Sequence, residues 1–303
     1  MLIAILMCLL STLALADSSS PRLAAYYDLN LAICDGQVYE WEDRDRPRAV
    51  MEGVRQVGVG RDRRYALTDE GRLLTWSDAG DTPTELMRDV HAFHAGRSGL
   101  LVIHEDGTLW SQPVQGLWGF GEHLAKQPTR VAADVRAAAV GDSANYYVTE
   151  QGDLFVHGKA FRGQYGDGKL READGYTRTA GDVIQVVAHT GHALILKRDG
   201  TVWGTGGNIY GPLGHHGYGD KAIAWGRIVD DATAIATGSS HSLAIRRDGS
   251  LWIWGRNEGL DPRRVLDDVL AVAASSKYSL AIGQGKLWQW RTGDAPEAVM
   301  PCT

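Results

Sequence analysis

The sequence predicts an all-β chain folded as a seven-bladed β-propeller, and three observations support this. A unit in which two stretches, each with apolar residues at alternate positions, are joined by a turn at a glycine occurs seven times between Asp35 and Trp290. The joining glycines are Gly36, Gly71, Gly107, Gly152, Gly200, Gly249 and Gly285, at intervals of 35, 36, 45, 48, 49 and 36 residues. Such a period is typical of repeat architectures. Each unit also begins with small residues and ends with a bulky aromatic, the size gradient of a propeller blade.

A strand of small residues opens each unit, and we expect it to be the innermost strand of its blade. Neighbouring sheets converge at the axis of a radial array, so large side chains would clash there. The expected inner strands lie at 54–60, 90–96, 135–141, 183–188, 234–238 and 269–274, with Leu23-Ala24-Ala25 as a degenerate first copy.

The second stretch of each unit alternates apolar residues, as a half-buried strand does. Asp-Gly or a variant of it then closes a tight hairpin, because glycine adopts positive φ without strain. The third stretch carries a bulky residue that we expect far from the axis: Tyr39, Trp76, Trp110, Phe155, Trp203, Trp252 and Trp288. A helical solenoid is excluded because no long 3.6-residue period exists. An open β-solenoid is the alternative, but its repeats are usually shorter and need capping units.

The units resemble a known family, the regulator of chromosome condensation repeat, whose fold is a seven-bladed propeller. Residues 229–255 read VDDATAIATGSSHSLAIRRDGSLWIWG and follow the pattern of that repeat nearly throughout. Residues 158–168 and 207–214 match its glycine-rich loop. The resemblance covers Leu23 to Trp290 and is strongest in the fifth and sixth units.

The first sixteen residues are almost wholly apolar and uncharged, and Ala14-Leu15-Ala16 is typical of a signal peptidase site. We therefore expect a signal peptide at 1–16, a single domain at 17–303, and an exported protein that is periplasmic or secreted, with no membrane insertion after cleavage. An uncleaved anchor or a misassigned start is the alternative. The net charge is −6, and an acidic chain lacks the basic footprint of a nucleic-acid or anionic-membrane binder.

Signal cleavage would leave two cysteines, Cys34 near one end and Cys302 near the other. Two thiols in an exported chain favour a disulfide, whereas their distance in sequence favours two unpaired residues. In a closed ring the first and last blades are neighbours. We therefore expect a Cys34–Cys302 disulfide.

The strong signatures of catalytic and metal chemistry are missing from this sequence. It contains no H-E-x-x-H, no G-x-S-x-G and no paired cysteine ligands. His215-His216 could form a metal pair only if the loop bends, and no third ligand lies nearby in sequence. We therefore assign no catalytic, cofactor-binding or metal-binding residue, and expect no cofactor.

The turns between first and second strands should converge on one mouth of the central channel, where propellers bind partners. The candidate contact residues there are Tyr27, Arg61, Asp62, Arg63, Arg97, Asp142, His192, His241 and Lys277. A solvated face is the alternative for the charged run. For His192 and His241 the alternative is a structural role in which a ring nitrogen binds backbone.

The glycine-rich loops of units three to five form a second candidate surface, because they carry several aromatic residues. These are Trp118, Phe161, Tyr165, Tyr210 and Tyr218. Trp and Tyr are enriched among interface anchors. Packing between blades is the alternative for the same residues.

These features favour an exported, non-catalytic propeller that binds a protein partner. The chain is also similar to secreted bacterial propellers that inhibit β-lactamases, which implies an enzyme inhibitor or an immunity protein as a specific form. A lyase or hydrolase acting at the channel mouth is the first alternative, and a buried histidine–carboxylate cluster with perturbed pKa values would favour it. An exchange-factor-like regulator of a small GTPase is the second alternative, implied by the nuclear members of the family.

Overall fold

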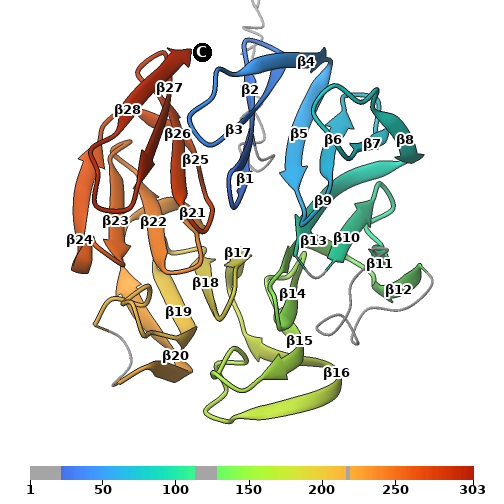
Figure 1. Ribbon diagram of the computed structural model, residues 1–303. Coiled ribbons are helices and arrows are strands. Elements are labelled where there is room, and N and C mark those ends of the chain that lie inside the picture. The colour runs from blue at the N-terminus through green and yellow to red at the C-terminus, as the bar shows by residue number, and fades with distance from the viewer. Residues whose placement is uncertain (1–21, 98, 113–127, 216–218) are drawn as a thin grey trace, which may run out of the picture.

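The predicted propeller is confirmed by the computed structural model, which describes residues 22–97, 99–112, 128–215 and 219–303. These ranges contain strands and turns and no helix. Seven four-stranded antiparallel sheets stand around a common axis (Figure 1). Each sheet is one blade.

The strands follow one another along the chain, four to a blade. Blade 1 holds β1 (Leu23–Tyr26), β2 (Leu29–Cys34), β3 (Gln37–Glu42) and β4 (Arg48–Glu52). Blade 2 holds β5 (Val54–Val59), β6 (Arg64–Thr68), β7 (Leu73–Trp76) and β8 (Thr84–Met87). Blade 3 holds β9 (Val90–Gly96), β10 (Gly99–His104), β11 (Leu109–Gln112) and β12 (Thr129–Ala132). Blade 4 holds β13 (Val135–Val140), β14 (Ala144–Thr149), β15 (Leu154–Ala160) and β16 (Arg171–Ala180). Blade 5 holds β17 (Val183–Ala188), β18 (His192–Lys197), β19 (Val202–Gly207) and β20 (Lys221–Val229). Blade 6 holds β21 (Ala232–Thr237), β22 (His241–Arg246), β23 (Leu251–Gly255) and β24 (Gly259–Leu266). Blade 7 holds β25 (Val269–Ala274), β26 (Tyr278–Gly283), β27 (Lys286–Arg291) and β28 (Glu297–Pro301).

All seven predicted hairpins join the second and third strands of separate blades. The joining glycines have φ between +71° and +94°, in the left-handed region that residues with a Cβ disfavour. The position of each glycine in the sequence therefore fixes where the chain reverses.

The first strands of successive blades are the innermost ones, and contacts between them run around the ring. Two glutamines lock neighbouring inner strands together. The side-chain amide of Gln185 on β17 donates to the carbonyl of Ile235 on β21 at 3.2 Å, and its oxygen accepts the Ile235 N–H at 3.0 Å. Gln56 on β5 binds the backbone of Phe93 on β9 in the same way.

Two features of the outer strands differ from the sequence-based expectation. The repeat pattern does not reveal the fourth strand, which is largely exposed and irregular in register. Trp76 is also not an outer residue. In blade 5 the outer aromatic residue, Trp203, pairs with Ile195 of the second strand. In blade 2 the equivalent position, opposite Ala66, is occupied by Leu74. Trp76 lies two residues closer to the mouth, where it is buried and donates to Glu40 Oε2 of blade 1 at 2.9 Å.

The ring closes between blades 1 and 7 without exchanging a strand, because each sheet is built from four consecutive strands. Side chains and a covalent bond make the closure instead. Cys34 and Cys302 form a disulfide with their Cα atoms 4.8 Å apart, as predicted. Toward the other end of the same seam, the indole of Trp41 donates to Gln289 Oε1 at 2.9 Å, and the Gln289 amide donates to the Asp43 carbonyl at 2.7 Å.

Candidate binding face

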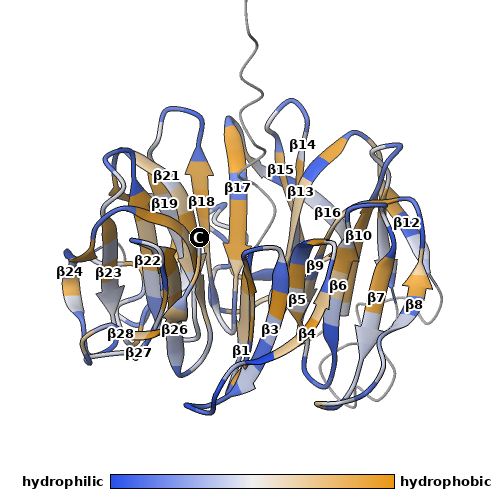
Figure 2. Ribbon diagram, turned by 90° about the horizontal axis from the view of Figure 1, so that it is seen from above, coloured by the Kyte–Doolittle hydropathy of each residue, from blue (hydrophilic) through white to orange (hydrophobic). Residues whose placement is uncertain are grey.

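Two sets of loops that the sequence suggested as separate surfaces lie on the same face of the ring. Antiparallel order brings the turn between first and second strands to the same end as the loop between third and fourth strands. Apolar residues lie mainly on the strands and hydrophilic ones in the loops at both ends (Figure 2). Hydrogen bonds join the two sets: Lys159 N–H donates to the Ser143 carbonyl at 2.8 Å, and Gly207 N–H donates to the Gly191 carbonyl at 2.8 Å. We call this end of the propeller the mouth face.

The predicted mouth residues differ in how accessible they are. Tyr27 is 49% exposed, and Arg61, Asp62 and Arg63 are exposed in the turn between β5 and β6. Arg97 pairs with Asp142 at 3.5 Å, and Lys277 pairs with Asp28 of blade 1 at 2.6 Å. The mouth is therefore a polar ring in which several charges already have partners.

Side chains from opposite blades fill the centre of the mouth. The rings of Tyr26 in blade 1 and His189 in blade 5 stack with centroids 6.4 Å apart. Burial, together with the negative charge of Asp142, raises the pKa of Tyr26 to about 12. The two rings meet across the axis and narrow the channel at this level.

A histidine–carboxylate group does lie at the mouth, which is the feature that would favour an enzyme. Burial lowers the pKa of His94 to about 4, and burial lowers the pKa of His189 against the opposing effect of Asp142. Both imidazoles bind backbone: His94 Nδ1 accepts the Val140 N–H at 3.1 Å, and His189 Nδ1 accepts the Thr190 N–H at 2.9 Å. A general base needs a pKa near the working pH, so these histidines suit a structural role better than proton transfer at neutral pH.

The structure corrects the assignment of His192 and His241 to the contact surface. They are 2% and 0% exposed. His192 Nε2 shares a hydrogen bond with the hydroxyl of Thr237 in blade 6, and His241 Nε2 shares one of 2.9 Å with the hydroxyl of Ser279 in blade 7. Both histidines therefore join one blade to the next, through side-chain hydroxyls rather than backbone.

These two buried imidazoles should make stability depend on pH. Burial lowers the pKa of each to about 3, whereas an unfolded histidine has a pKa near 6.5. The unfolded chain therefore binds protons that the folded chain does not, and the stabilisation present above about pH 6.5 should be lost as the pH falls toward 3. Each histidine can contribute at most about 1.4 kcal/mol per pH unit. Urea unfolding at several values between pH 7.5 and 4.5 measures this slope.

His241→Asn removes one of these groups and should flatten the slope, whatever it does to stability at pH 7.5. His215→Asn is a matched control, because His215 is exposed. Parallel pH profiles for the wild type and His241→Asn would show that the buried imidazole is not the source.

The loops of blades 4 and 5 share one register, and each presents two residues at its tip. Phe161-Arg162 in blade 4 and Ile209-Tyr210 in blade 5 both precede a glycine of positive φ, Gly163 or Gly211. Phe161 is 62% exposed and Tyr210 is 52% exposed. The prediction that these two aromatics lie on an accessible loop surface therefore agrees with their exposure.

Tyr165 does not belong to this surface. It is 0% exposed and packs between blades 4 and 5, and its hydroxyl donates to the Gly158 carbonyl at 3.1 Å. Leu213 fills the equivalent position in blade 5 and is also fully buried. Tyr165-Gly166 and Leu213-Gly214 occupy equivalent positions in the repeat, and this equivalence was the signal in the sequence that Tyr165 would be buried. Trp118 and Tyr218 lie outside the described residues.

The surface formed by these loop tips extends onto blade 6, through residues that the sequence analysis did not identify. The guanidinium of Arg256 lies 4.9 Å from the centroid of the Tyr210 ring. Leu260 packs on Gly211, where an added Cβ would come within 2.4 Å of its Cδ2. Ile209, Tyr210, Arg256 and Leu260 line a hollow of about 750 Å³ between these loops. Only the contact between blades reveals this grouping.

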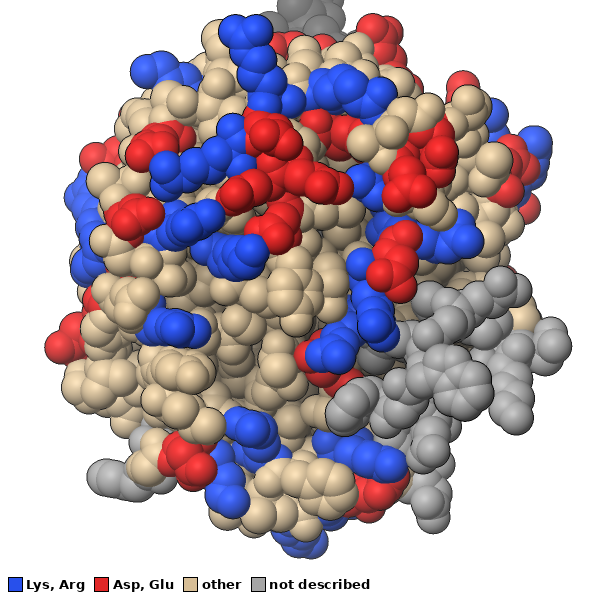
Figure 3. Space-filling model, viewed as in Figure 1, with Lys and Arg blue, Asp and Glu red and all other residues tan. Residues whose placement is uncertain are grey.

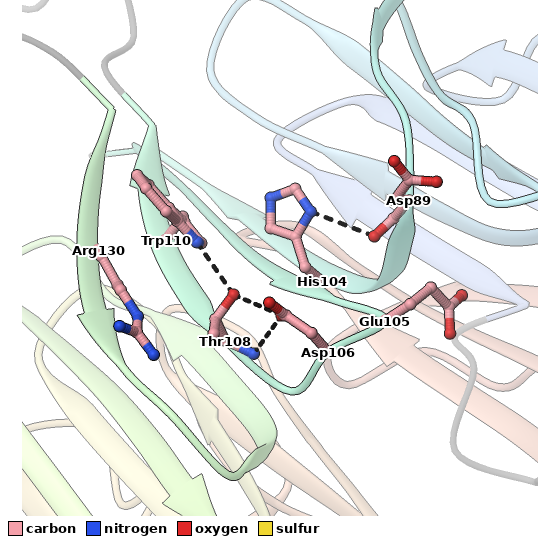
Figure 4. A pocket seen from close by; sticks show the side chains of 7 residues that line it. All are labelled: Asp89, His104, Glu105, Asp106, Thr108, Trp110 and Arg130. Atoms are coloured by element: carbon pink, nitrogen blue, oxygen red, sulfur yellow. Dashed lines mark hydrogen bonds between the residues drawn. The ribbon is translucent and has the colours of Figure 1, made fainter.

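A second hollow, of about 650 Å³, lies at the opposite end of blade 3 around Trp110 (Figure 4). Asp106 Oδ1 accepts from the Thr108 N–H at 2.9 Å and from its hydroxyl, and Thr108 Oγ1 accepts the Trp110 indole N–H at 3.0 Å. Asp199-Thr201-Trp203 and Asp248-Ser250-Trp252 repeat the same bonds. These hydrogen bonds lower the pKa of all three aspartates. The arrangement thus stabilises the hairpins. No group of three or more metal-ligating side chains occurs in the part of the chain that the structure describes.

Comparisons with known proteins agree with the repeat and the blade count. The model of the regulator of chromosome condensation (RCC1) repeat matches residues 232–258, which form most of blade 6. The E3 ubiquitin-protein ligase HERC2 of Mus musculus is 28% identical over 204 residues, and that of Homo sapiens is 27% identical over 204 residues. Each match covers 56% of this chain, which spans only 4% of the relatives' length.

Solved structures share the whole ring. Prp20p from Saccharomyces cerevisiae, studied for its binding to Gsp1p and histones, has a TM-score of 0.72 at 17% identity, covering 86% of this chain and 81% of that one. Human WBSCR16 has a TM-score of 0.71 at 17% identity, covering 86% and 85%. At such identities the likeness shows the fold alone. The chain therefore contains an RCC1 repeat in blade 6, within a closed ring of seven blades.

Proposed function

We propose that this chain is a non-catalytic propeller that binds a protein partner through its mouth face. The observation that carries the proposal is the exposure of Phe161, Tyr210 and Tyr27 on one rigid face. Large aromatic side chains held by a fixed backbone lose little conformational freedom on binding and make effective interface anchors. Prp20p, a structural neighbour, also binds proteins, which supports the same reading.

Export to the periplasm or the cell exterior is part of the proposal. The uncharged apolar segment at 1–16 and the disulfide that joins the ends of the ring support it, because disulfides persist in oxidising compartments. No helix in the described ranges is long and apolar enough to cross a membrane. Within this setting the partner is an enzyme that the propeller inhibits or a toxin that it neutralises.

Affinity capture tests the proposal. A Phe161→Ala/Tyr210→Ala variant should lose capture of the partner that the wild-type chain retains, by at least tenfold in affinity. Its melting temperature should stay within about 2 °C, because exposed positions seldom change stability by more than about 0.5 kcal/mol. An Arg61→Glu/Arg63→Glu variant examines the charged turn of the mouth in the same assay.

Leu270→Ala is the matched control, since Leu270 is 69% exposed at the start of β25, at the other end of the blade. Retention of full affinity by both mouth-face variants would refute the proposed face. Loss of affinity in the Leu270→Ala variant would indicate that the interface lies at the end of the propeller opposite the mouth face.

A further inference from the structure

We infer that the mouth face binds an acidic segment of its partner along one strip of residues, which extends the proposed function. The strip comprises Phe161, Arg162, Ile209, Tyr210, Arg256 and Leu260. All six side chains are exposed. The inference concerns the charge of the partner and depends on the mouth face being the interface.

The strip is continuous across blades 4, 5 and 6. The Arg162 side chain leaves the blade 4 loop and lies over the backbone of blade 5, where an added Cβ at Gly207 would come within 3.3 Å of its Cδ. Ile209 and Tyr210 follow Gly207 along the chain, and Arg256 of blade 6 stacks on Tyr210 at 4.9 Å. Tyr210 and Arg256, with the apolar side chains of Ile209 and Leu260, line a hollow of about 750 Å³, and Phe161 and Arg162 extend the strip from the neighbouring loop of blade 4.

The arginines of the strip carry charge that is not neutralised within the described residues. Neither Arg162 nor Arg256 forms an ion pair with a described carboxylate. By contrast, two neighbouring acids form ion pairs, Asp167 with Arg171 at 2.7 Å and Glu258 with Arg263. A third, Asp261, lies 2.8 Å from Nε2 of His215. The strip therefore has a local positive charge on a chain whose net charge is −6.

The positive charge of the strip stands out because the surface around it carries few other charges. Charged side chains of both signs crowd the part of the surface over blades 1, 2 and 7, whereas blades 4 to 6 carry fewer charges in a largely uncharged surround (Figure 3). An arginine held against an aromatic ring suits a carboxylate, which it can bind in a bidentate manner. Two exposed arginines, one of them beside the hollow that Ile209 and Leu260 line, fit a peptide that combines acidic residues with one apolar anchor. Nucleic acid is disfavoured, since its binding needs a run of cations that neutralises many phosphates.

The test uses a fluorescein-labelled dodecapeptide of glutamates with one central leucine, and its counterpart with every Glu replaced by Gln. Fluorescence anisotropy with the full chain should show at least tenfold tighter binding of the Glu peptide at 50 mM salt, weakening as salt is raised. Arg162→Glu/Arg256→Glu should remove that preference, while Arg162→Lys/Arg256→Lys should keep most of it. Arg136→Glu/Arg198→Glu, at exposed positions away from the strip, should behave like the wild type.

Other outcomes separate this inference from the proposed function. Equal binding of both peptides, lost only in Phe161→Ala/Tyr210→Ala, would contradict the inference of an acidic partner but would still support binding at the mouth face. Tighter binding of a single-stranded oligonucleotide or of phosphatidylserine vesicles than of the Glu peptide would contradict the inference that the partner is a protein. No binding of the Glu peptide at millimolar concentration would also overturn the inference. Binding that no mouth-face variant alters would count against both.

Discussion

A Cys34→Ala/Cys302→Ala variant should unfold with a free energy about 4–5 kcal/mol below that of the oxidised wild type. The disulfide joins residues separated by 268 positions, so it closes nearly the whole chain into one loop and restricts the unfolded state strongly. It also holds the boundary between blades 1 and 7, where no shared strand joins the sheets. Alanine is the suitable replacement because both sites are buried and a hydroxyl would need a partner. Urea unfolding measures the difference.

Reductant provides the control for this prediction. Dithiothreitol should destabilise the wild type by a similar amount and leave the double-alanine variant unchanged. A loss below about 1 kcal/mol would mean that the non-covalent contacts of the seam, such as Lys277 with Asp28 and Gln289 with Trp41, suffice to hold the ring shut.

Glu40→Ala should cost about 3–5 kcal/mol of unfolding free energy, the usual effect of breaking a buried ion pair. Glu40 of blade 1 is almost fully buried and lies 3.3 Å from Nε of Arg64 in blade 2, whose side chain is buried as well. It also accepts the Trp76 indole N–H at 2.9 Å. Removing the carboxylate leaves the Arg64 guanidinium poorly compensated between two blades. Chemical denaturation at neutral pH checks the loss.

Glu42→Ala is a matched control, because Glu42 also pairs with Arg64, at 3.2 Å, but has a side chain that is 60% exposed. Exposed pairs contribute at most about 1 kcal/mol. A Glu40→Met/Arg64→Leu variant should recover much of the loss, because it removes the two buried charges together. Arg48, the other partner of Glu40, has a side chain that is 52% exposed, so water can solvate its charge. Equal losses for Glu40→Ala and Glu42→Ala would show that burial does not strengthen the pair.

The local signals in this sequence were sufficient for the blades. Each hairpin depends on a glycine that reaches positive φ and on two alternating stretches around it, and both act within about a dozen residues. The count of seven followed from these, and the Cys34–Cys302 disulfide followed from ring closure. The fourth strands were missed because they are exposed and carry little apolar alternation.

The binding face was less accessible to sequence reasoning, because exposure depends on neighbouring blades. Phe161 and Tyr165 are both aromatic residues of one glycine-rich loop, yet one is 62% exposed and the other is buried. Trp76 similarly fills a buried position next to Glu40 rather than an outer one. Composition cannot separate such residues, whereas their position in the repeat can once the blades are aligned.

The sequence by itself determined the repeat, the turns, the seven blades and the pairing of the two cysteines, because each rests on backbone preference or on the closure of a ring. Only the tertiary structure decided that the mouth turns and the aromatic loops share one face, that His192 and His241 join blades, and that Arg162 and Arg256 keep their charge exposed beside Tyr210. These outcomes arise from contacts between residues of different blades, where packing and the nearest opposite charge decide what each side chain can do.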